Sequence, residues 1–251
     1  MAIATFLAMT AAEMALAEIF PRHTAWMACH FSPYGTGLTN LPESLPPDSL
    51  LILNDRTPIH GHDPQLIADQ LSHCLEQLGC RGLLLDFQHT DCEETQTLVK
   101  MLLTTLPCPV GVTEFYVQED IPHPVFLPPV PPSSTLESYL SPWIGRELWL
   151  ELALDGACIT LTEEGSHMVS LSDPECNISG FQDETLHCHY SIQTAEDQAR
   201  FTLWRTPEDL KNLITAAESL GITACVGLYQ EFKNNRAEFC LRPERQLLIQ
   251  R

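Results

Sequence analysis

The chain has 251 residues, 44% of them hydrophobic, so it can bury a core as one large domain or two small ones. Its 33 acidic residues outnumber its 13 basic residues, and the formal net charge is −20. Nucleic acid is bound by clusters of Lys and Arg that displace counterions from phosphates, and this sequence has no such cluster. The same charge disfavours binding to an anionic membrane surface. We therefore expect a globular protein that binds neither nucleic acid nor membranes.

The ten cysteines form no C-x-x-C pair, the spacing typical of zinc ribbons and thioredoxin-like redox sites. Cys29 and Cys225 lie inside apolar runs, where a small buried thiol is the ordinary interpretation. Reduced, structural cysteines in a cytoplasmic protein are therefore expected. Residues 1–20 are only superficially like a signal peptide, because they lack a basic start and contain Glu13 and Glu18. A buried strand followed by a helical turn is predicted there.

Apolar runs and helical stretches alternate over the first half of the chain. Strands are predicted over 25–32, 50–55, 81–87 and 109–116. A helix is predicted over 63–79, where Asp63 is a candidate N-cap, Pro64 lies in the first turn and Gly79 ends the helix. A second helix is predicted over 92–107. This alternation indicates right-handed crossovers and a parallel sheet.

The second half continues the pattern and then departs from it. Further strands are predicted over 124–130, 147–154 and 224–231, with a helix over 206–221. Roughly eight apolar runs in about 250 residues match the size of a (β/α)₈ TIM barrel. Residues 157–171 alternate apolar and polar around Gly165, which predicts an inserted β-hairpin, and strands are expected over 186–192 and 200–206. Because no clean boundary appears, we predict one (β/α)₈-like domain over 1–251, made irregular by the hairpin over 157–171.

Active sites of such barrels lie where the strands end at their carboxyl termini. The residues at these positions are mainly carboxylates and aromatics: His30, Ser32, Asn54, Asp55, Asp86, Gln88, Glu114, Tyr116, Glu151, Tyr190, Trp204, Tyr229 and Glu231. Aromatic faces stack on sugar rings, and carboxylates bind hydroxyl groups or exchange protons with them. The set therefore favours a carbohydrate pocket. The alternative is that these acids only cap helices and solvate loops.

Residues 81–88 resemble the signature strand of the glycoside hydrolase family 18, the chitinase-like barrels. That signature has the form Asp-Gly-x-Asp-x-Asp-x-Glu and ends in the catalytic acid. Gly82, Asp86 and the aromatic Phe87 keep the pattern. The other three acidic positions hold Arg81, Leu84 and Gln88.

A longer likeness covers residues 159–171, 186–192 and 208–231, which resemble the end of spore-type and LysM-associated members of that family. In those proteins a small hairpin precedes a strand, a helix and a final barrel strand. Tyr229 falls near a position where they often carry a sugar-stacking Trp. The two likenesses together cover about half of the chain.

The resemblance implies an amino-sugar oligosaccharide as the ligand. In the family, the Glu protonates the glycosidic oxygen and a neighbouring Asp orients the N-acetyl group of the substrate. The amide of Gln88 can donate a hydrogen bond but cannot deliver a proton. The protein is therefore expected either to bind glycan without catalysis or to use a relocated acid, with Glu114 and Glu231 as candidates.

On this hypothesis Asp86 and Gln88 line the centre of the site, and Glu114 and Glu231 form its wall. The substrate-binding residues are expected to be Tyr116, Tyr190, Trp204, Tyr229 and Asp55.

Two other classes of function stay open. A metal-dependent hydrolase is suggested by His187 and His189, which would share one face of a strand, and by the group His60, His62 and Asp63. A non-catalytic scaffold with an acidic surface for a basic partner is the other. The leading hypothesis requires no cofactor, and the sequence has neither a complete dinucleotide motif nor a phosphate-binding loop. Catalysis by a Ser/His/Asp triad is disfavoured because no G-x-S-x-G elbow occurs.

Overall fold

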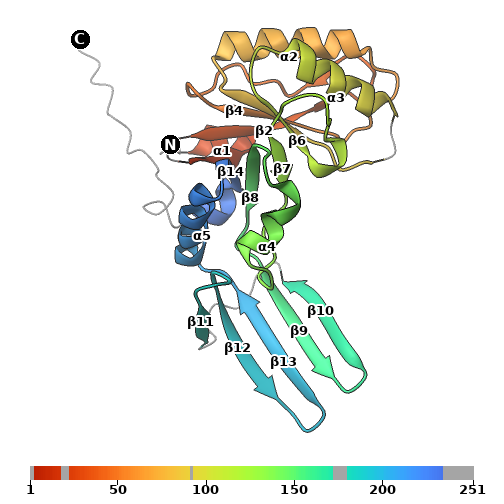
Figure 1. Ribbon diagram of the computed structural model, residues 1–251. Helices are drawn as coiled ribbons and strands as arrows, with labels where there is room; N and C mark the ends of the chain where they lie inside the picture. The colour runs from red at the N-terminus through yellow and green to blue at the C-terminus, as the bar shows by residue number, and fades with distance from the viewer. Residues whose placement is uncertain (1–2, 18–22, 91–92, 172–179, 234–251) are drawn as a thin grey trace, which may run out of the picture.

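The computed structural model describes residues 3–17, 23–90, 93–171 and 180–233. Within them, parallel strands close into an eight-stranded barrel, which Figure 1 shows in the upper part of the molecule. The strands, in spatial order, are β1 (Ala4–Met9), β14 (Ile222–Leu228), β8 (Leu148–Leu152), β7 (Val125–Leu127), β6 (Val110–Thr113), β5 (Gly82–Asp86), β4 (Leu50–Asn54) and β2 (Thr24–Phe31). Pairing of β1 with β2 closes the barrel, and the short β3 (Leu38–Thr39) pairs antiparallel with β2. The predicted (β/α)₈ architecture is therefore confirmed.

Helices cover the outside of the barrel unevenly. The long helices α2 (Pro64–Leu78) and α3 (Glu93–Thr105) lie side by side over β2, β4, β5 and β6. The other side is covered by α4 (Leu136–Leu140) and α5 (Pro207–Ser219), while α1 (Ala11–Leu16) and α6 (Tyr229–Phe232) are short. Single 3₁₀ turns, η1 (Glu114–Tyr116) and η2 (Ser141–Trp143), occur in the crossovers between β6 and β8. The barrel is thus irregular.

The boundaries of α2 follow from its sequence. The side chain of Asp63 accepts a hydrogen bond from the backbone N–H of Gln65, which satisfies a free donor of the first turn. Gly79 adopts a left-handed conformation with φ of 60° and ends the helix. Ile67 and Leu71 lie on the buried face that packs against the barrel. Both ends of the predicted helix are confirmed.

The amino-terminal half of the barrel interior is filled by one large side chain, Trp149 of β8. A Cβ atom added to Gly111 would lie 2.6 Å from the indole ring, so the absence of a side chain there makes room for it. The indole is buried among Phe6, Leu50 and Ala224. Only a small cavity of about 80 Å³ lies beside Trp149 at this end among the described residues, and a much larger cavity opens at the opposite, carboxyl-terminal end.

A five-stranded antiparallel sheet is inserted between β8 and α5 and projects from the barrel (Figure 1). Its order is β10 (Gly165–Leu171), β9 (Gly156–Thr162), β13 (Gln198–Trp204), β12 (Cys188–Thr194) and β11 (Phe181–Asp183). β9 and β10 form the predicted hairpin, with Gly165 at a φ of 142° beside the turn. The additional strands predicted over 186–192 and 200–206 are β12 and β13, displaced by about two residues along the chain.

Arg205 fixes the base of this sheet to the barrel. Its guanidinium group is buried and donates hydrogen bonds to the backbone carbonyls of Val130, Pro131, Leu186 and His187. Nη1 also lies 3.6 Å from Oδ1 of Asp155, which immediately precedes β9. One side chain therefore joins both ends of the inserted sheet to the segment that follows β7.

The seven cysteines within the described residues are free thiols. Burial raises the pKa of Cys29 and of Cys225 to about 12, so both are protonated and unreactive at neutral pH. Three further cysteines, at 92, 176 and 240, lie outside the described residues. In the described part of the chain, no helix combines the length and apolar character needed to cross a membrane.

Candidate functional site

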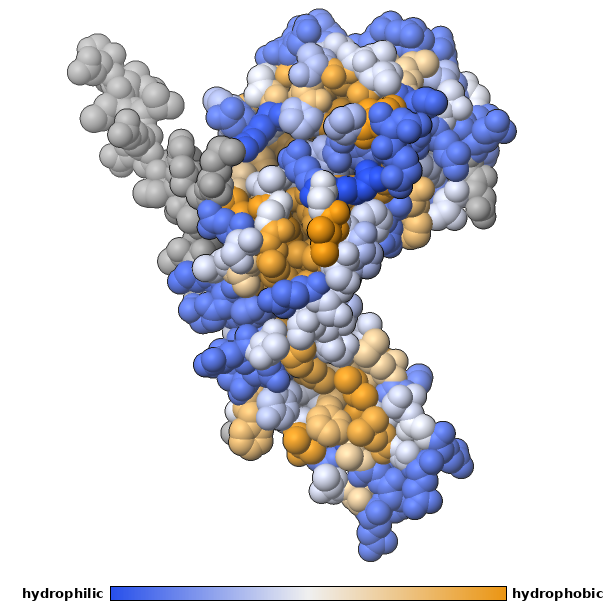
Figure 2. Space-filling model, in the orientation of Figure 1, coloured by the Kyte–Doolittle hydropathy of each residue, from blue (hydrophilic) through white to orange (hydrophobic). Residues whose placement is uncertain are grey.

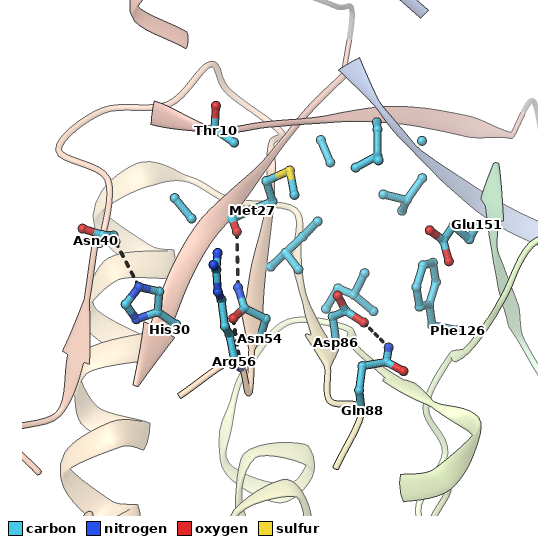
Figure 3. Close-up of a pocket in the computed structure, with 17 residues that line it drawn as sticks. Thr10, Met27, His30, Asn40, Asn54, Arg56, Asp86, Gln88, Phe126 and Glu151 are labelled. Atoms are coloured by element: carbon cyan, nitrogen blue, oxygen red, sulfur yellow. Dashed lines mark hydrogen bonds between the residues drawn. The ribbon is translucent and has the colours of Figure 1, made fainter. Parts of the chain in front are cut away.

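A cavity of about 550 Å³ opens at the carboxyl-terminal end of the barrel (Figure 3). Its floor is apolar and is formed by Ile52, Leu84, Phe126 and Val226. Polar side chains stand above this floor: Thr10, His30, Asn40, Asn54, Arg56, Asp86, Gln88 and Glu151. The two layers follow from strand alternation, since residues two apart on one strand face the same side.

β5 supplies two of the polar side chains, Asp86 and Gln88. Leu84, Asp86 and Gln88 face the cavity, whereas Phe87 faces the helices and is fully buried against Phe31. Gln88 donates a hydrogen bond from Nε2 to Oδ1 of Asp86 over 2.7 Å. Burial raises the pKa of Asp86, the nearby Asp55 raises it further, and the hydrogen bond from Gln88 opposes both effects. The two residues predicted to line the centre are thus brought together at the cavity.

Asp55 holds the loop after β5 in place. Its Oδ2 accepts hydrogen bonds from the backbone N–H groups of Gln88 and His89, at 3.0 and 2.8 Å, and lies 2.9 Å from the His89 ring. The carboxylate is buried and does not line the cavity. Asp55 is therefore a positioning residue for Gln88, whereas the sequence suggested that it would contact substrate.

Glu151 of β8 faces the same cavity as Asp86. Burial raises its pKa to about 7, and the carboxylates of Asp86, Glu231 and Asp155 add to this shift in that order. Among the described residues, no hydrogen bond to the carboxyl group of Glu151 is found. The cavity therefore contains an acid that is about half protonated near neutral pH and is free to meet a ligand.

The opposite wall comes from β2 and β4. Asn54 donates from Nδ2 to the backbone carbonyls of Met27 and Cys29, at 3.3 and 3.1 Å, where the pairing of β2 with β4 shifts register. Asn40 lies 3.2 Å from Nε2 of His30, and Arg56 is exposed at the rim. This wall offers amide, imidazole and guanidinium groups opposite the two carboxylates.

Glu114 and Glu231, the expected wall carboxylates, do not line the cavity. β6 ends at Thr113, whose hydroxyl donates to the carbonyl of Phe87, so Glu114 begins the turn η1. β14 ends at Leu228, which leaves Glu231 in α6, where its Oε2 accepts from the N–H of Leu154 at 3.1 Å. Both strands end earlier than the apolar runs suggested, and this moves the two acids away from the cavity.

The four aromatic residues expected to stack on sugar also lie elsewhere. Tyr116 and Tyr229 are buried, and the hydroxyl of Tyr116 donates to the carbonyl of His89. Tyr190 and Trp204 belong to the inserted sheet, where Trp204 is buried and stacks on His189. The aromatic ring at the cavity is instead that of Phe126, which in the sequence resembles any core residue of a strand.

The histidines considered as metal ligands have other partners. His187 precedes β12 with a φ of 49°, so it does not share the strand face of His189. His189 lies 2.7 Å from the buried carboxylate of Asp209. His60 pairs with Glu94, and the ring of His62 hydrogen-bonds to the backbone carbonyl of Ser32. Over the residues that the structure describes, no group of three or more His, Cys, Asp or Glu side chains could hold a metal ion.

Known structures share the fold of this chain. The spore cortex-lytic enzyme SleL of Bacillus cereus superposes with a TM-score of 0.55 at 12% identity, over 95% of this chain and 74% of that one. A chitinase from Chromobacterium violaceum gives 0.57 at 9% identity, over 90% and 93% of the two chains. A family 18 chitinase from Cycas revoluta, in complex with (GlcNAc)₃, gives 0.58 at 11% identity, over 94% and 97%.

These likenesses establish the fold of the chain as that of chitinase-type barrels, as the resemblance of residues 81–88 led us to expect. No protein-family model and no curated protein sequence matches the chain.

Proposed function

We propose that the protein binds an amino-sugar oligosaccharide in the cavity at the carboxyl-terminal end of the barrel. The observation that carries this proposal is the hydrogen-bonded pair of Asp86 and Gln88 facing an open cavity above Phe126. A carboxylate acceptor beside an amide is suited to the hydroxyl and acetamido groups of such a sugar. The size of the cavity is within the range of small-molecule sites, and its position is the usual one in barrels.

The apolar floor and the polar layer above it would each bind a different part of a sugar ring. The apolar floor, with Phe126, would contact the C–H face of a sugar ring, while Asp86, Gln88 and Asn54 meet its polar edge. Likeness of fold supports the ligand class, because the Cycas revoluta chitinase was solved with (GlcNAc)₃. Binding without cleavage is favoured because Gln88, at the position of the family's acid, carries no transferable proton.

A second candidate function is hydrolysis with Glu151 as the acid. The observation that favours it is the pKa of about 7 for a carboxyl group that lines the cavity. An acid with such a pKa is matched to proton transfer at neutral pH. Glu151 would protonate the leaving glycosidic oxygen while water adds to the anomeric carbon and its proton passes to the Asp86 carboxylate.

Calorimetric titration with chito-oligosaccharides of increasing length tests the first proposal. We expect saturable binding that weakens at least tenfold in Asp86→Asn, because the carboxylate acceptor is lost. Glu137→Gln, an exposed change on α4, is the matched control and should bind as the parent does. Failure of every amino-sugar oligosaccharide to bind would overturn the proposal.

A chromogenic chitobioside assay between about pH 5 and pH 8 then separates binder from hydrolase. Turnover that disappears in Glu151→Gln while binding persists would establish the second candidate. Binding with no turnover at any pH would support the first proposal and exclude the second.

A further inference from the structure

The projecting sheet has one apolar and one polar face. Its strand register aligns Met168, Ile159, Phe201 and Ile192 in a single row across β10, β9, β13 and β12. Neighbouring rows on the same side add Leu161 with Ala199, and Tyr190 with Phe181. These eight residues, Ile159, Leu161, Met168, Phe181, Tyr190, Ile192, Ala199 and Phe201, are called the apolar sheet face below.

The opposite side of the same strands is polar, because alternate residues point to opposite faces. It carries Thr160, Arg200, Thr202, Gln193 and His167, with Val169 as its one large exposed apolar residue among those described. Antiparallel sheets with this alternation normally cover the apolar side with other parts of the protein.

Much of the apolar sheet face is uncovered by the described residues. Phe181 is 64% exposed, Met168 53%, Ile192 47% and Leu161 41%. Near the barrel a contact begins to cover it, since the hydroxyl of Ser133 lies 3.8 Å from the sulfur of Met168. Figure 2 shows apolar residues gathered over this sheet beyond that contact. A contiguous exposed apolar patch of this kind marks a binding surface.

The far end of the sheet is acidic. Glu163 and Glu164 occupy the turn between β9 and β10, and Glu196 and Asp197 occupy the turn between β12 and β13. The two turns are adjacent because Gln198 pairs with Thr162. An occupant that extends to this end should therefore be apolar along its length and basic where it meets the four carboxylates. A second copy of a chain with charge −20 does not fit this requirement.

We propose that residues 234–251 of the same chain bind across the apolar sheet face. This segment, NNRAEFCLRPERQLLIQR, contains four of the chain's 13 basic residues and only two acids. Ala237, Phe239 and Leu241 alternate with Arg236, Glu238, Cys240 and Arg242, three of which are charged, and this is the pattern of a strand with one apolar side. Leu247, Leu248 and Ile249 form a second apolar group, followed by Arg251.

The segment begins at the base of the sheet. It follows α6, in which the side chain of Glu231 accepts a hydrogen bond from the N–H of Leu154, two residues before β9 begins. A seven-residue strand is about 23 Å long, whereas 18 extended residues span about 60 Å. Residues 234–251 can therefore cross the whole sheet and bring their arginines to Glu163, Glu164, Glu196 and Asp197.

Hydroxyl-radical footprinting of the full chain, read by mass spectrometry, tests the proposal. Met168 and Phe201 should be protected in the full chain and several-fold more oxidised in a chain that ends at Lys233. Tyr34, which is 86% exposed on a loop of the barrel, reports the radical dose and should not change. Equal oxidation of Met168 in the full and shortened chains would overturn the proposal.

Point variants guard against misfolding of the shortened chain. Phe239→Asp with Leu241→Asp should expose Met168 as the truncation does, whereas Glu238→Gln, on the other side of the predicted strand, should not. Charge reversal by Glu163→Lys with Glu164→Lys should weaken the protection, and raised salt should act in the same direction. If Met168 stays protected in the double Asp variant and the protein has the mass of a dimer in solution, a second copy of the chain covers the face. That result would contradict the proposal.

Discussion

The side chains of Gln88 and Asp86 are joined by a 2.7 Å hydrogen bond at the edge of the barrel cavity, with the amide as donor. Gln88, which the resemblance of residues 81–88 aligns with the acid of family 18 barrels, therefore supports the neighbouring carboxylate as an acceptor. The same loop is held by Asp55, which accepts from two consecutive backbone N–H groups. The pair is thus held in a fixed arrangement, and Glu151, whose pKa is raised by burial to about 7, faces the same cavity.

Gln88→Glu should weaken oligosaccharide binding at pH 7 and restore much of it near pH 5. The substitution replaces the donor with a second carboxylate beside Asp86, and two such groups cannot both ionise without strong repulsion. We expect the Kd for a chito-oligosaccharide to rise about tenfold at neutral pH, measured by calorimetry. Gln88→Leu removes the donor without adding charge, so its loss of affinity should not vary with pH in this way. Identical pH profiles for the two variants would contradict the assignment.

Glu151→Gln should stabilise the protein at high pH. The pKa of Glu151 is about 7 in the fold and ordinarily 4.5, so the folded state binds more protons than the unfolded chain between these values. The free energy of unfolding therefore falls as the pH rises through this window. Near pH 8 the free energy of unfolding of the variant should exceed that of the parent by on the order of 1–3 kcal/mol. Near pH 4 the two should not differ.

Urea unfolding at several pH values measures this effect, with the exposed change Glu137→Gln as control. The pKa values of Asp86 and Asp155 are also raised, so the variant should keep part of the parent's pH dependence. A parent and variant with parallel curves across the whole range would show that Glu151 titrates normally.

Gly111→Ala should destabilise the barrel without affecting the cavity. The new methyl group would lie 2.6 Å from the indole of Trp149, and overpacking of this kind costs about 1–3 kcal/mol of unfolding free energy. Combining it with Trp149→Leu should recover part of that loss relative to the sum of the single changes. Ligand affinity should be unchanged, since Trp149 lies at the amino-terminal end of the barrel. Urea unfolding and calorimetry together decide the outcome, and strict additivity would argue against the contact.

Arg205→Lys should loosen the attachment of the projecting sheet. The single ammonium group of lysine cannot replace the planar guanidinium group, which contacts the carbonyls of Val130 and His187 and the carboxylate of Asp155 at the same time. Lysine keeps the charge but leaves some of these carbonyls without a donor, which should cost about 1.5–3 kcal/mol. Arg200→Lys, in the same sheet but exposed, should change stability by less than about 0.5 kcal/mol. Hydrogen exchange should rise first in β9 and β13, and uniform exchange in the two variants would refute the anchoring role.

Several features of this protein are local, and the sequence alone was enough to predict them. Asp63, Pro64 and Gly79 delimit α2 because capping and left-handed turns depend on a few adjacent residues. The alternation around Gly165 predicts the β9–β10 hairpin for the same reason. Asp86 and Gln88 could be placed at the cavity because a buried parallel strand ends in residues that face the active-site end.

The positions of the other predicted site residues depend on tertiary structure, that is, on where each strand ends and which segments pack together. Glu114 and Glu231 follow apolar runs, yet β6 ends at Thr113 and β14 at Leu228, because the end of a strand depends on backbone pairing with strands that are distant in the sequence. Tyr116 and Tyr229 are directed into the core by packing that no local pattern encodes.

The importance of Glu151 also comes from tertiary structure. Its pKa depends on burial and on Asp86, Asp155 and Glu231, and all but Asp155 are brought near it by the fold. The acidic composition of the chain, with its charge of −20, was readable from the sequence. Which of those acids share a cavity was determined only by closure of the barrel, because electrostatic interactions depend on distance in space and not on separation along the chain.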